Sequence, residues 1–139
     1  MAALLISHLR ADIMTRNKSV IKPTEAELTL LTVLWQVGPA TVRQIHDAVS
    51  STQKTGYTTV LKILQIMHEK TLVTRDESNR AHVYAAADSE ASTQSSLIKD
   101  LSHKAFGGST SKLVMCAIDE STSPEEINDI RQRLNSLER

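Results

Sequence analysis

Cysteine and aromatic residues are scarce in this chain of 139 residues. Its one cysteine, Cys116, excludes an intrachain disulfide and a zinc site built from several cysteines, and it suits a reducing compartment. Only 3% of the residues are aromatic, which disfavours a large ligand pocket, since such pockets are usually lined by aromatic side chains. The apolar run 1–6 is too short for a membrane span and is soon followed by His8 and Arg10. We therefore expect a cytoplasmic protein with no signal peptide and no membrane insertion.

The residue patterns of enzymes and metal sites are also missing. The five histidines are scattered, and the sequence has no His-Glu-x-x-His motif, no cysteine pair and no glycine-rich phosphate loop. We therefore expect no catalytic residue, no metal site and no cofactor. Cys116 lies among Val114, Met115 and Ala117, which predicts a packed thiol rather than a redox sensor.

Net charge is formally zero, but the charges are unevenly distributed. Residues 1–87 hold ten Lys and Arg against seven Asp and Glu, a balance of +3, and residues 88–139 hold six against nine, a balance of −3. The basic half is the one that can approach a phosphate backbone, although a difference this small is a weak signal.

Three helices are predicted in the basic half. Thr24 and Glu27 form a capping-box pattern, from which a helix runs to about Val37 and ends at Gly38-Pro39. A second capping box at Thr41 begins a short helix. A third helix begins at about residue 55 or 56 after a polar turn, and its expected buried face consists of Val60, Ile63, Leu64 and Met67.

A two-stranded ribbon is predicted after these helices. Residues 72–75 and 81–85 read as strands, and the polar residues 76–80 between them are typical of a hairpin turn. A helix-turn-helix followed by such a ribbon predicts a winged helix, a fold that usually places one helix in the DNA major groove. The predicted fold class is mainly α with a small β-wing: an N-terminal arm (1–20), a winged helix-turn-helix domain (21–87) and a C-terminal helical dimerisation region (88–139).

The third helix has the polar face that a DNA-reading helix needs. Thr can bond a phosphate or present its methyl group to thymine, Gln can pair with adenine, and Lys can reach guanine or phosphate. Arginines on the ribbon are suited to phosphate contacts, with Arg80 at the turn preferred. The predicted contacts with double-stranded operator DNA are Arg43, Lys54, Thr55, Tyr57, Thr58, Thr59, Lys62, Gln65, Arg75 and Arg80.

The acidic half contains three further helical patterns. A stripe begins at Leu97 and breaks at Gly107-Gly108, a second helix follows, and Ser123-Pro124 begins a third. In the last helix the apolar residues step by three, four and three, which favours a seam between two copies, although a buried face within one chain has the same spacing. We predict a homodimer held by Leu97, Leu101, Leu113, Val114, Ile118, Ile127, Ile130, Leu134 and Leu137.

Several segments resemble the penicillinase-repressor (BlaI/MecI) family of transcriptional regulators, which includes copper-responsive CopY-type members. They are Pro23-Thr24-Glu25-Ala26-Glu27-Leu28 with Val33-Leu34-Trp35, Thr41-Val42-Arg43-Gln44-Ile45, Tyr57-Thr58-Thr59-Val60, and His68-Glu69-Lys70 with Leu72-Val73. The resemblance covers about residues 22–139. It implies a homodimeric repressor that binds a dyad-symmetric operator, with reading-helix contacts near Thr58, Thr59 and Lys62.

The chain departs from the family at functional positions. Ile66 and Leu61 stand where relatives often carry basic residues. In the antibiotic-responsive branch the resemblance implies release by proteolysis, through a membrane sensor and protease system, at an Asn-Phe bond that corresponds here to Cys116-Ala117. The copper branch uses Cys-x-Cys motifs, which are missing here. The releasing signal therefore stays open between a beta-lactam, a metal and another input.

A second interpretation is a dimeric winged-helix protein-interaction module without sequence-specific DNA binding. Neutral net charge and Ile66 favour it, whereas the polar face at Thr58, Thr59 and Lys62 and the basic N-terminal half oppose it.

Overall fold

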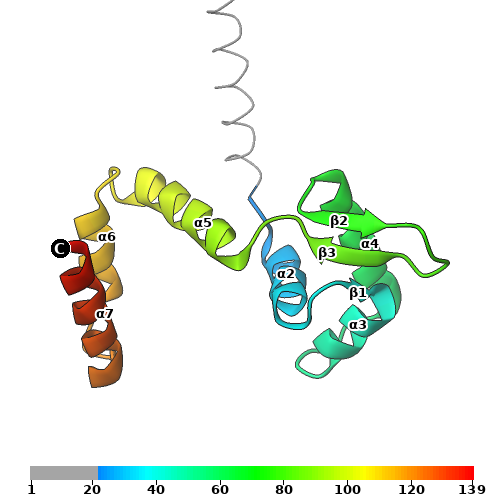
Figure 1. Ribbon diagram of the computed structural model, residues 1–139, viewed down its shortest axis with the longest axis horizontal. Coiled ribbons are helices and arrows are strands. Elements are labelled where there is room, and N and C mark those ends of the chain that lie inside the picture. Colours follow the sequence, from blue (N-terminus) through cyan, green and yellow to red (C-terminus); the bar gives the residue numbers. More distant parts are fainter. Residues whose placement is uncertain (1–21) are drawn as a thin grey trace, which may run out of the picture. The chain divides into compact units, whose positions relative to one another are not determined.

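The computed structural model describes residues 22–139, so the predicted arm 1–20 lies outside the described residues. Figure 1 shows the elements, which are α2 (Glu25–Val37), β1 (Ala40–Thr41), α3 (Val42–Ser50), α4 (Tyr57–Glu69), β2 (Val73–Asp76), β3 (Val83–Ala86), α5 (Glu90–Ala105), α6 (Thr110–Ala117) and α7 (Pro124–Leu137). The chain divides into two compact units between Leu97 and Ile98, inside α5. We call the described part up to Leu97 the winged unit and Ile98–Arg139 the C-terminal unit. The predicted domain boundary after residue 87 stays a prediction.

The first two helices begin at the predicted capping boxes. The Thr24 hydroxyl accepts from the Glu27 amide at 3.2 Å, and the Glu27 carboxylate accepts from the Thr24 amide at 2.9 Å. Thr41 and Gln44 repeat the arrangement at 3.3 and 2.9 Å. Each box satisfies two amides that have no partner inside the helix, which fixes where the helix starts.

Helix α4 begins without a capping box and ends in a motif of backbone hydrogen bonds. Its N-cap, Gly56, supplies no side-chain hydrogen bond. At its end the Leu72 amide donates to the Met67 carbonyl at 2.9 Å and the Thr71 amide donates to the His68 carbonyl at 3.1 Å. This pair of bonds is a Schellman motif, in which the residue after the cap takes a left-handed conformation. Thr71 adopts it with a φ of 63°, although glycine is the usual residue there.

The three strands form one antiparallel sheet in the order β1-β3-β2. The ribbon of β2 and β3 confirms the predicted wing, with Arg75 opposite Tyr84. Strand β1 was not expected from the sequence, and it pairs Ala40 with Tyr84 on the other edge of β3. Tyr84 therefore lies in the central strand, where it is 1% exposed and belongs to the core.

The core of the winged unit lies between the three helices and the sheet. Its buried side chains come from α2, α3, α4 and all three strands: Leu30, Leu31, Leu34, Ala40, Val42, Ile45, Val49, Val60, Leu64, Met67, Val73 and Tyr84. Trp35 packs against this cluster, and its indole N–H also donates to the Asp88 carbonyl at 3.0 Å. Burial of an apolar face from each helix fixes α4 on the unit with its opposite face outward.

One carboxylate is buried beside this core. Glu27 is 3% exposed, and the Lys70 ammonium, at the end of α4, lies 2.9 Å from its Oε1. Burial raises the pKa of Glu27, but the hydrogen bond from the Thr24 backbone and the bond and charge of Lys70 outweigh it, so this pKa lies below its ordinary value. The pair joins the start of α2 to the end of α4.

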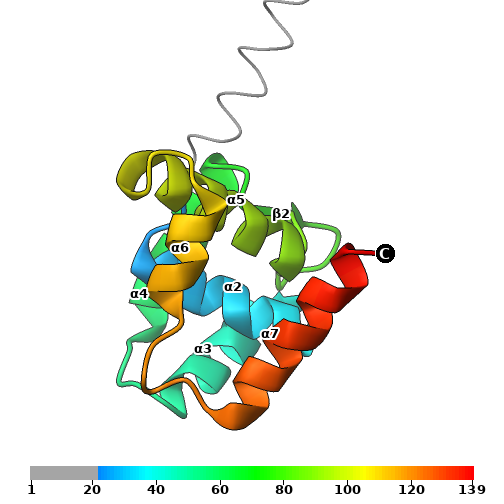
Figure 2. The same cartoon turned by 90° about the vertical axis from the view of Figure 1, so that its left-hand side faces the viewer.

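Helices α5, α6 and α7 contain no buried residue among those described. Figure 2 shows that α6 and α7 diverge from the loop that joins them. Cys116, at the end of α6, is exposed, so the expectation of a packed thiol is wrong for the single chain. None of the residues of α6 is buried, so the neighbouring apolar side chains do not enclose the thiol.

Candidate nucleic-acid interface

Helix α4 has one buried face and one outward polar face. Val60, Leu64 and Met67 are fully buried, at 0% exposure. On the opposite side Thr58, Lys62 and Gln65 recur at helical spacing, and all three are exposed. Their hydroxyl, ammonium and amide groups are those that bind base edges and phosphates. The polar stripe is therefore held outward on a rigid element.

Two residues flank this stripe on α4. Thr59 is exposed and lines, with Thr55, a shallow groove of about 500 Å³ toward α2. Ile66 is 39% exposed, so the helix surface next to Lys62 is apolar. An isoleucine cannot bind phosphate, but it can make an apolar contact with a thymine methyl group.

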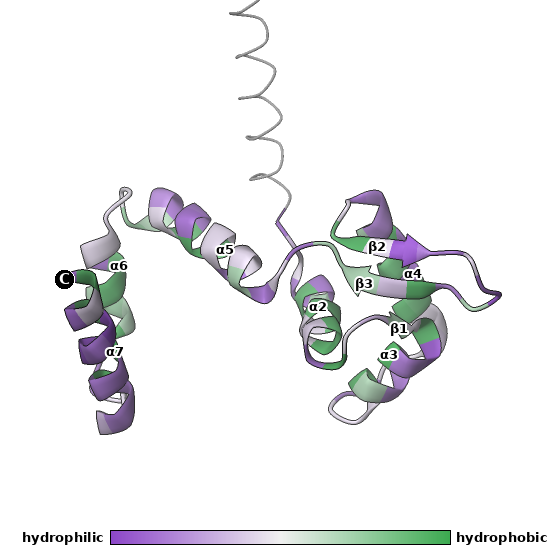
Figure 3. Cartoon of the chain, in the orientation of Figure 1, coloured by the Kyte–Doolittle hydropathy of each residue, from purple (hydrophilic) through white to green (hydrophobic). Residues whose placement is uncertain are grey.

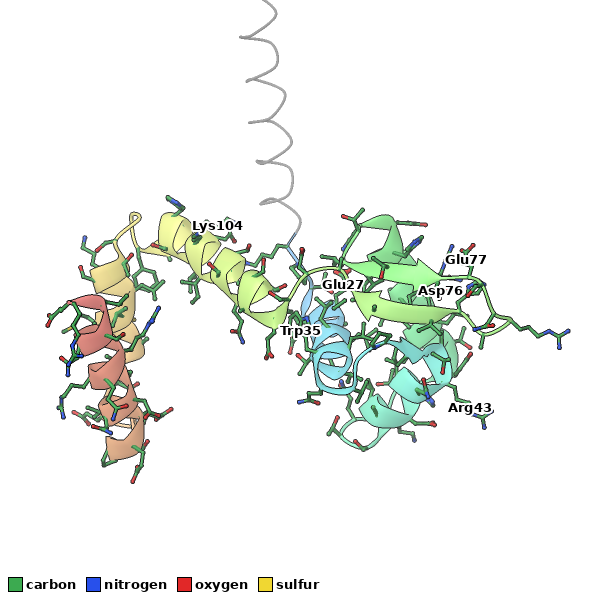
Figure 4. The ribbon with its side chains drawn as sticks, in the orientation of Figure 1. Glu27, Trp35, Arg43, Asp76, Glu77 and Lys104 are labelled. Carbon is green, nitrogen blue, oxygen red and sulfur yellow. The ribbon has the colours of Figure 1, made fainter. Side chains whose placement is uncertain are left out.

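A second groove, of about 410 Å³, lies between α3, the first half of α4 and the wing. Arg43, Tyr57, Leu61, Arg80 and His82 line it together with other residues of the same elements. Figure 4 shows Arg43 projecting outward from α3. Arg43 and Arg80, both predicted to contact DNA, are 37 positions apart in the sequence. The fold brings them to the borders of one groove beside the start of α4.

The wing divides its two arginines between different roles. Arg75 is half-buried, and its guanidinium is engaged by Glu77 and by Tyr84 across the ribbon. The hydrogen bond with Tyr84 and the ion pair with Glu77 raise the pKa of the Arg75 guanidinium. The contact of Arg75 with phosphate stays a prediction, and its charge is already matched within the wing. Arg80 is exposed, and no carboxylate of residues 22–139 is ion-paired with it.

The turn that carries Arg80 is stabilised by its own side chains. The carboxylate of Asp76 accepts from the Ser78 amide at 2.9 Å, and bonds from the Ser78 side chain and backbone lower the pKa of Asp76. Figure 4 shows Asp76 and Glu77 at the wing, near the end of β2. Asp76 and Glu77 therefore interact with other residues of the wing, Asp76 with Ser78 and Glu77 with Arg75.

Four predicted cationic contacts stay unpaired within the part of the chain that the structure describes. Arg43, Lys54, Lys62 and Arg80 are all exposed and none of them has an ion-pair partner there. Unpaired exposed cations on one module are available to neutralise phosphates.

Sequence reasoning missed His46 as part of this region. Its Nε2 lies 2.7 Å from the Thr55 carbonyl and 3.2 Å from the Ser50 hydroxyl. Its ring meets that of Tyr57 edge to face, with the centroids 5.9 Å apart. The spacing of nine residues between His46 and Thr55 carries no periodic signal, so only the fold reveals the contact.

The predicted dimerisation residues lie outside any core. Leu101, Ile127, Leu134 and Leu137 are 46, 37, 53 and 64% exposed. The other five, which are partly buried, are Leu97, Leu113, Val114, Ile118 and Ile130. Figure 3 shows α6 as mainly hydrophobic and α7 as mainly hydrophilic, so the apolar residues of α7 form a narrow stripe.

Within residues 22–139 no group of three or more His, Cys, Asp or Glu side chains is placed to hold a metal ion. None of the helices described there is long and apolar enough to cross a membrane.

Comparisons with known proteins identify the family of this chain. The sequence model of the penicillinase repressor family matches residues 23–136. The chain is 30% identical over 115 residues to the transcriptional regulator BlaI of Mycobacterium tuberculosis, in two strains, which covers 82% of this chain and 83% of that protein. Among solved structures, a MarR family protein from Bacillus stearothermophilus aligns with a TM-score of 0.48 at 19% identity, over 99% of this chain and 90% of that one. Apo-NmtR aligns with a TM-score of 0.43 at 23% identity, over 75% and 82%. Because the family match spans most of the chain, this protein belongs to the penicillinase repressor family of transcriptional regulators.

Proposed function

We propose that this repressor acts as a homodimer that binds a dyad-symmetric DNA operator through helix α4. The observation that carries the proposal is the outward stripe of Thr58, Lys62 and Gln65, held in place by a fully buried opposite face. A helix fixed in this way can enter a major groove with its polar side chains preorganised against base edges.

Phosphate contacts are assigned to the unpaired cations around α4. Arg43 and Arg80 border the groove beside the start of the helix, so they are suited to the backbone on either side of the major groove. Lys54 precedes the helix and completes the set. Such contacts position the protein but carry no base information, which leaves base reading to α4.

The dimer is proposed from the apolar side chains that α5, α6 and α7 leave exposed. Leu134 and Leu137 of α7 are more than half exposed. In the proposed dimer the same apolar stripe of a second copy packs against them, so no other protein is needed to cover them. Two reading helices joined in this way hold both half-sites at high local concentration, which raises the operator affinity. Symmetry then predicts half-sites about 10 base pairs apart, centre to centre, or a multiple of that spacing.

The release signal is proposed to act on the C-terminal unit, because loss of pairing there lowers affinity without any change in α4. Cleavage through a membrane sensor and protease system, as in beta-lactam-responsive relatives, is one form of such a signal. The bond Cys116-Ala117 lies in the last turn of α6, and its side chains differ from the Asn-Phe pair of that branch. The proposal therefore does not extend to cleavage at this bond.

The test is footprinting on DNA from upstream of the chain's own gene, with a salt series against scrambled competitor. A symmetric footprint that resists competitor supports the proposal. Lys62→Ala is expected to weaken binding and to lower the slope of log affinity against log salt by about one if Lys62 contacts phosphate. Lys112→Ala, on an exposed lysine of α6, is the matched control and is expected to leave the slope unchanged. Weak, sequence-independent binding would contradict the proposal and favour the protein-interaction module instead.

A further inference from the structure

The start of helix α4, the proposed DNA-reading helix, has no side-chain cap. Helices α2, α3 and α7 each start at a capping box, whereas the N-cap of α4 is Gly56, which has no side chain to bond an amide. The first turn of α4 carries Tyr57 and Thr58, two of the DNA contacts predicted from the sequence. A contact from elsewhere in the fold has to fix this turn if its side chains are to be preorganised.

The turn between α3 and α4 is joined to α3 at its N-terminal end by backbone hydrogen bonds. The amides of Thr52 and Gln53 both donate to the Val49 carbonyl, at 3.1 and 3.0 Å. For Lys54 and Thr55, at the other end, the structure of residues 22–139 gives no such backbone bond to α3. The attachment there is the imidazole of His46, whose Nε2 lies 2.7 Å from the Thr55 carbonyl.

The chemistry of this contact determines which ring nitrogen of His46 carries the hydrogen. A carbonyl oxygen only accepts, so Nε2 must carry the hydrogen and donate it to Thr55. The Ser50 hydroxyl, 3.2 Å from the same nitrogen, is the weaker partner. The side chain is 24% exposed, and its ring also packs edge to face with Tyr57. One side chain of α3 therefore holds both the turn before α4 and the first residue of α4.

We propose that His46 is a positioning residue for DNA reading: its Nε2–H bond to Thr55 sets the start of α4 and thereby places Tyr57 and Thr58 at the operator. The proposal rests on the DNA-binding function proposed above. His46 itself contacts no DNA in this arrangement, so its loss lowers affinity through disorder of the turn and not through loss of a charge.

Two substitutions distinguish the effect of the hydrogen-bond donor of His46 from the effect of its ring packing. His46→Gln places an amide donor near the position of Nε2, whereas the shorter His46→Asn places its amide near Nδ1 and cannot reach the Thr55 carbonyl. Ser50→Ala removes only the weaker partner and is the control. Circular dichroism and thermal melting confirm that each variant is folded before binding is measured.

The measurements are operator affinity, its salt slope, and hydrogen exchange in the free full-length protein of the Gln53 and Val60 amides, which donate to the Val49 and Gly56 carbonyls on either side of the start of α4. His46→Asn is expected to bind about tenfold more weakly, with the salt slope unchanged and exchange of these amides about tenfold faster. His46→Gln is expected to stay within about twofold of the parent in all three measurements.

Three results would overturn the proposal. The first is unchanged affinity in His46→Asn, and the second is equal loss in His46→Gln, which would point to ring packing alone. The third is a fall in the salt slope, which would make His46 a phosphate contact. If the parent protein shows no specific binding, the proposed function has failed, and hydrogen exchange still decides separately whether His46 holds the turn.

Discussion

The buried pair of Glu27 and Lys70 allows a sharp test of how helix α4 is attached to the rest of the winged unit. Lys70→Met removes the ammonium and keeps an unbranched stem of similar length, so the packing of the stem is largely retained. Glu27, 3% exposed, is then left with only the hydrogen bonds from Thr24. Free energy of unfolding should fall because a buried carboxylate has lost its counter-charge.

The expected loss is about 2 kcal/mol at neutral pH. Removing one partner of a fully buried pair costs roughly 3–5 kcal/mol. Two features of this site reduce that figure: the Lys70 side chain is 38% exposed, so water replaces part of it, and the Thr24 amide still donates to the carboxylate at 2.9 Å. Lys70→Met also removes two hydrogen bonds to Glu27, at 2.9 and 3.2 Å. A buried polar group that loses its partner costs roughly 1–3 kcal/mol, and more if it is charged, so a loss of about 2 kcal/mol is consistent with this range.

The effect also has a defined pH dependence. Because the pKa of Glu27 is lowered on folding, its contribution is present above its unfolded pKa of about 4.5 and is lost as the pH falls through the folded pKa. In Lys70→Met this pKa rises relative to that of the parent, since the opposite charge is gone. The unfolded-state pKa is the same in both proteins, so the difference in stability between them should shrink as the pH falls from the folded pKa of Glu27 in Lys70→Met towards its lower folded pKa in the parent.

Urea unfolding followed by the fluorescence of Trp35 measures these differences. Trp35 is the only tryptophan and lies in α2, so its signal reports on the winged unit. Glu27→Gln keeps the capping box, and the double variant with Lys70→Met should be more stable than Lys70→Met alone because it buries no charge. A loss below about 0.5 kcal/mol, or a double variant no more stable than the single one, would refute the reasoning.

Three further predictions concern local structure and assembly. Thr71→Gly should stabilise the winged unit by about 0.5–1 kcal/mol, seen as a higher urea midpoint, because relief of the left-handed conformation exceeds the added chain entropy; Thr71→Ala, which keeps a Cβ, should not. Thr41→Ala should lower stability by about 1 kcal/mol through loss of the bond from the Gln44 amide, and an unchanged midpoint would contradict this. Leu134→Asp should convert a dimer to a monomer in sedimentation, whereas a parent protein that sediments as a monomer would contradict the proposed seam.

Local patterns in the sequence were sufficient for the helices and the wing. The capping boxes at Thr24 and Thr41 involve residues three apart, and both are present as predicted. The ribbon also followed from its strands and turn, although β3 begins at Val83 rather than at residue 81. Such features depend on neighbours along the chain, so they can be predicted without knowledge of the packing.

Contacts between distant residues were decided by the tertiary structure alone. Lys70 and Glu27 are 43 positions apart, and no periodicity links them. Arg75 looked free for phosphate, but pairing of β2 with β3 places it against Tyr84, and Glu77 takes its charge. Sequence by itself therefore determined which segments form the helices and the two-stranded wing, which face of α4 is polar, and the family, but not strand β1. Packing decided which of the polar side chains are engaged within the protein and which stay exposed and unpaired among the described residues, because that depends on which elements come together in space.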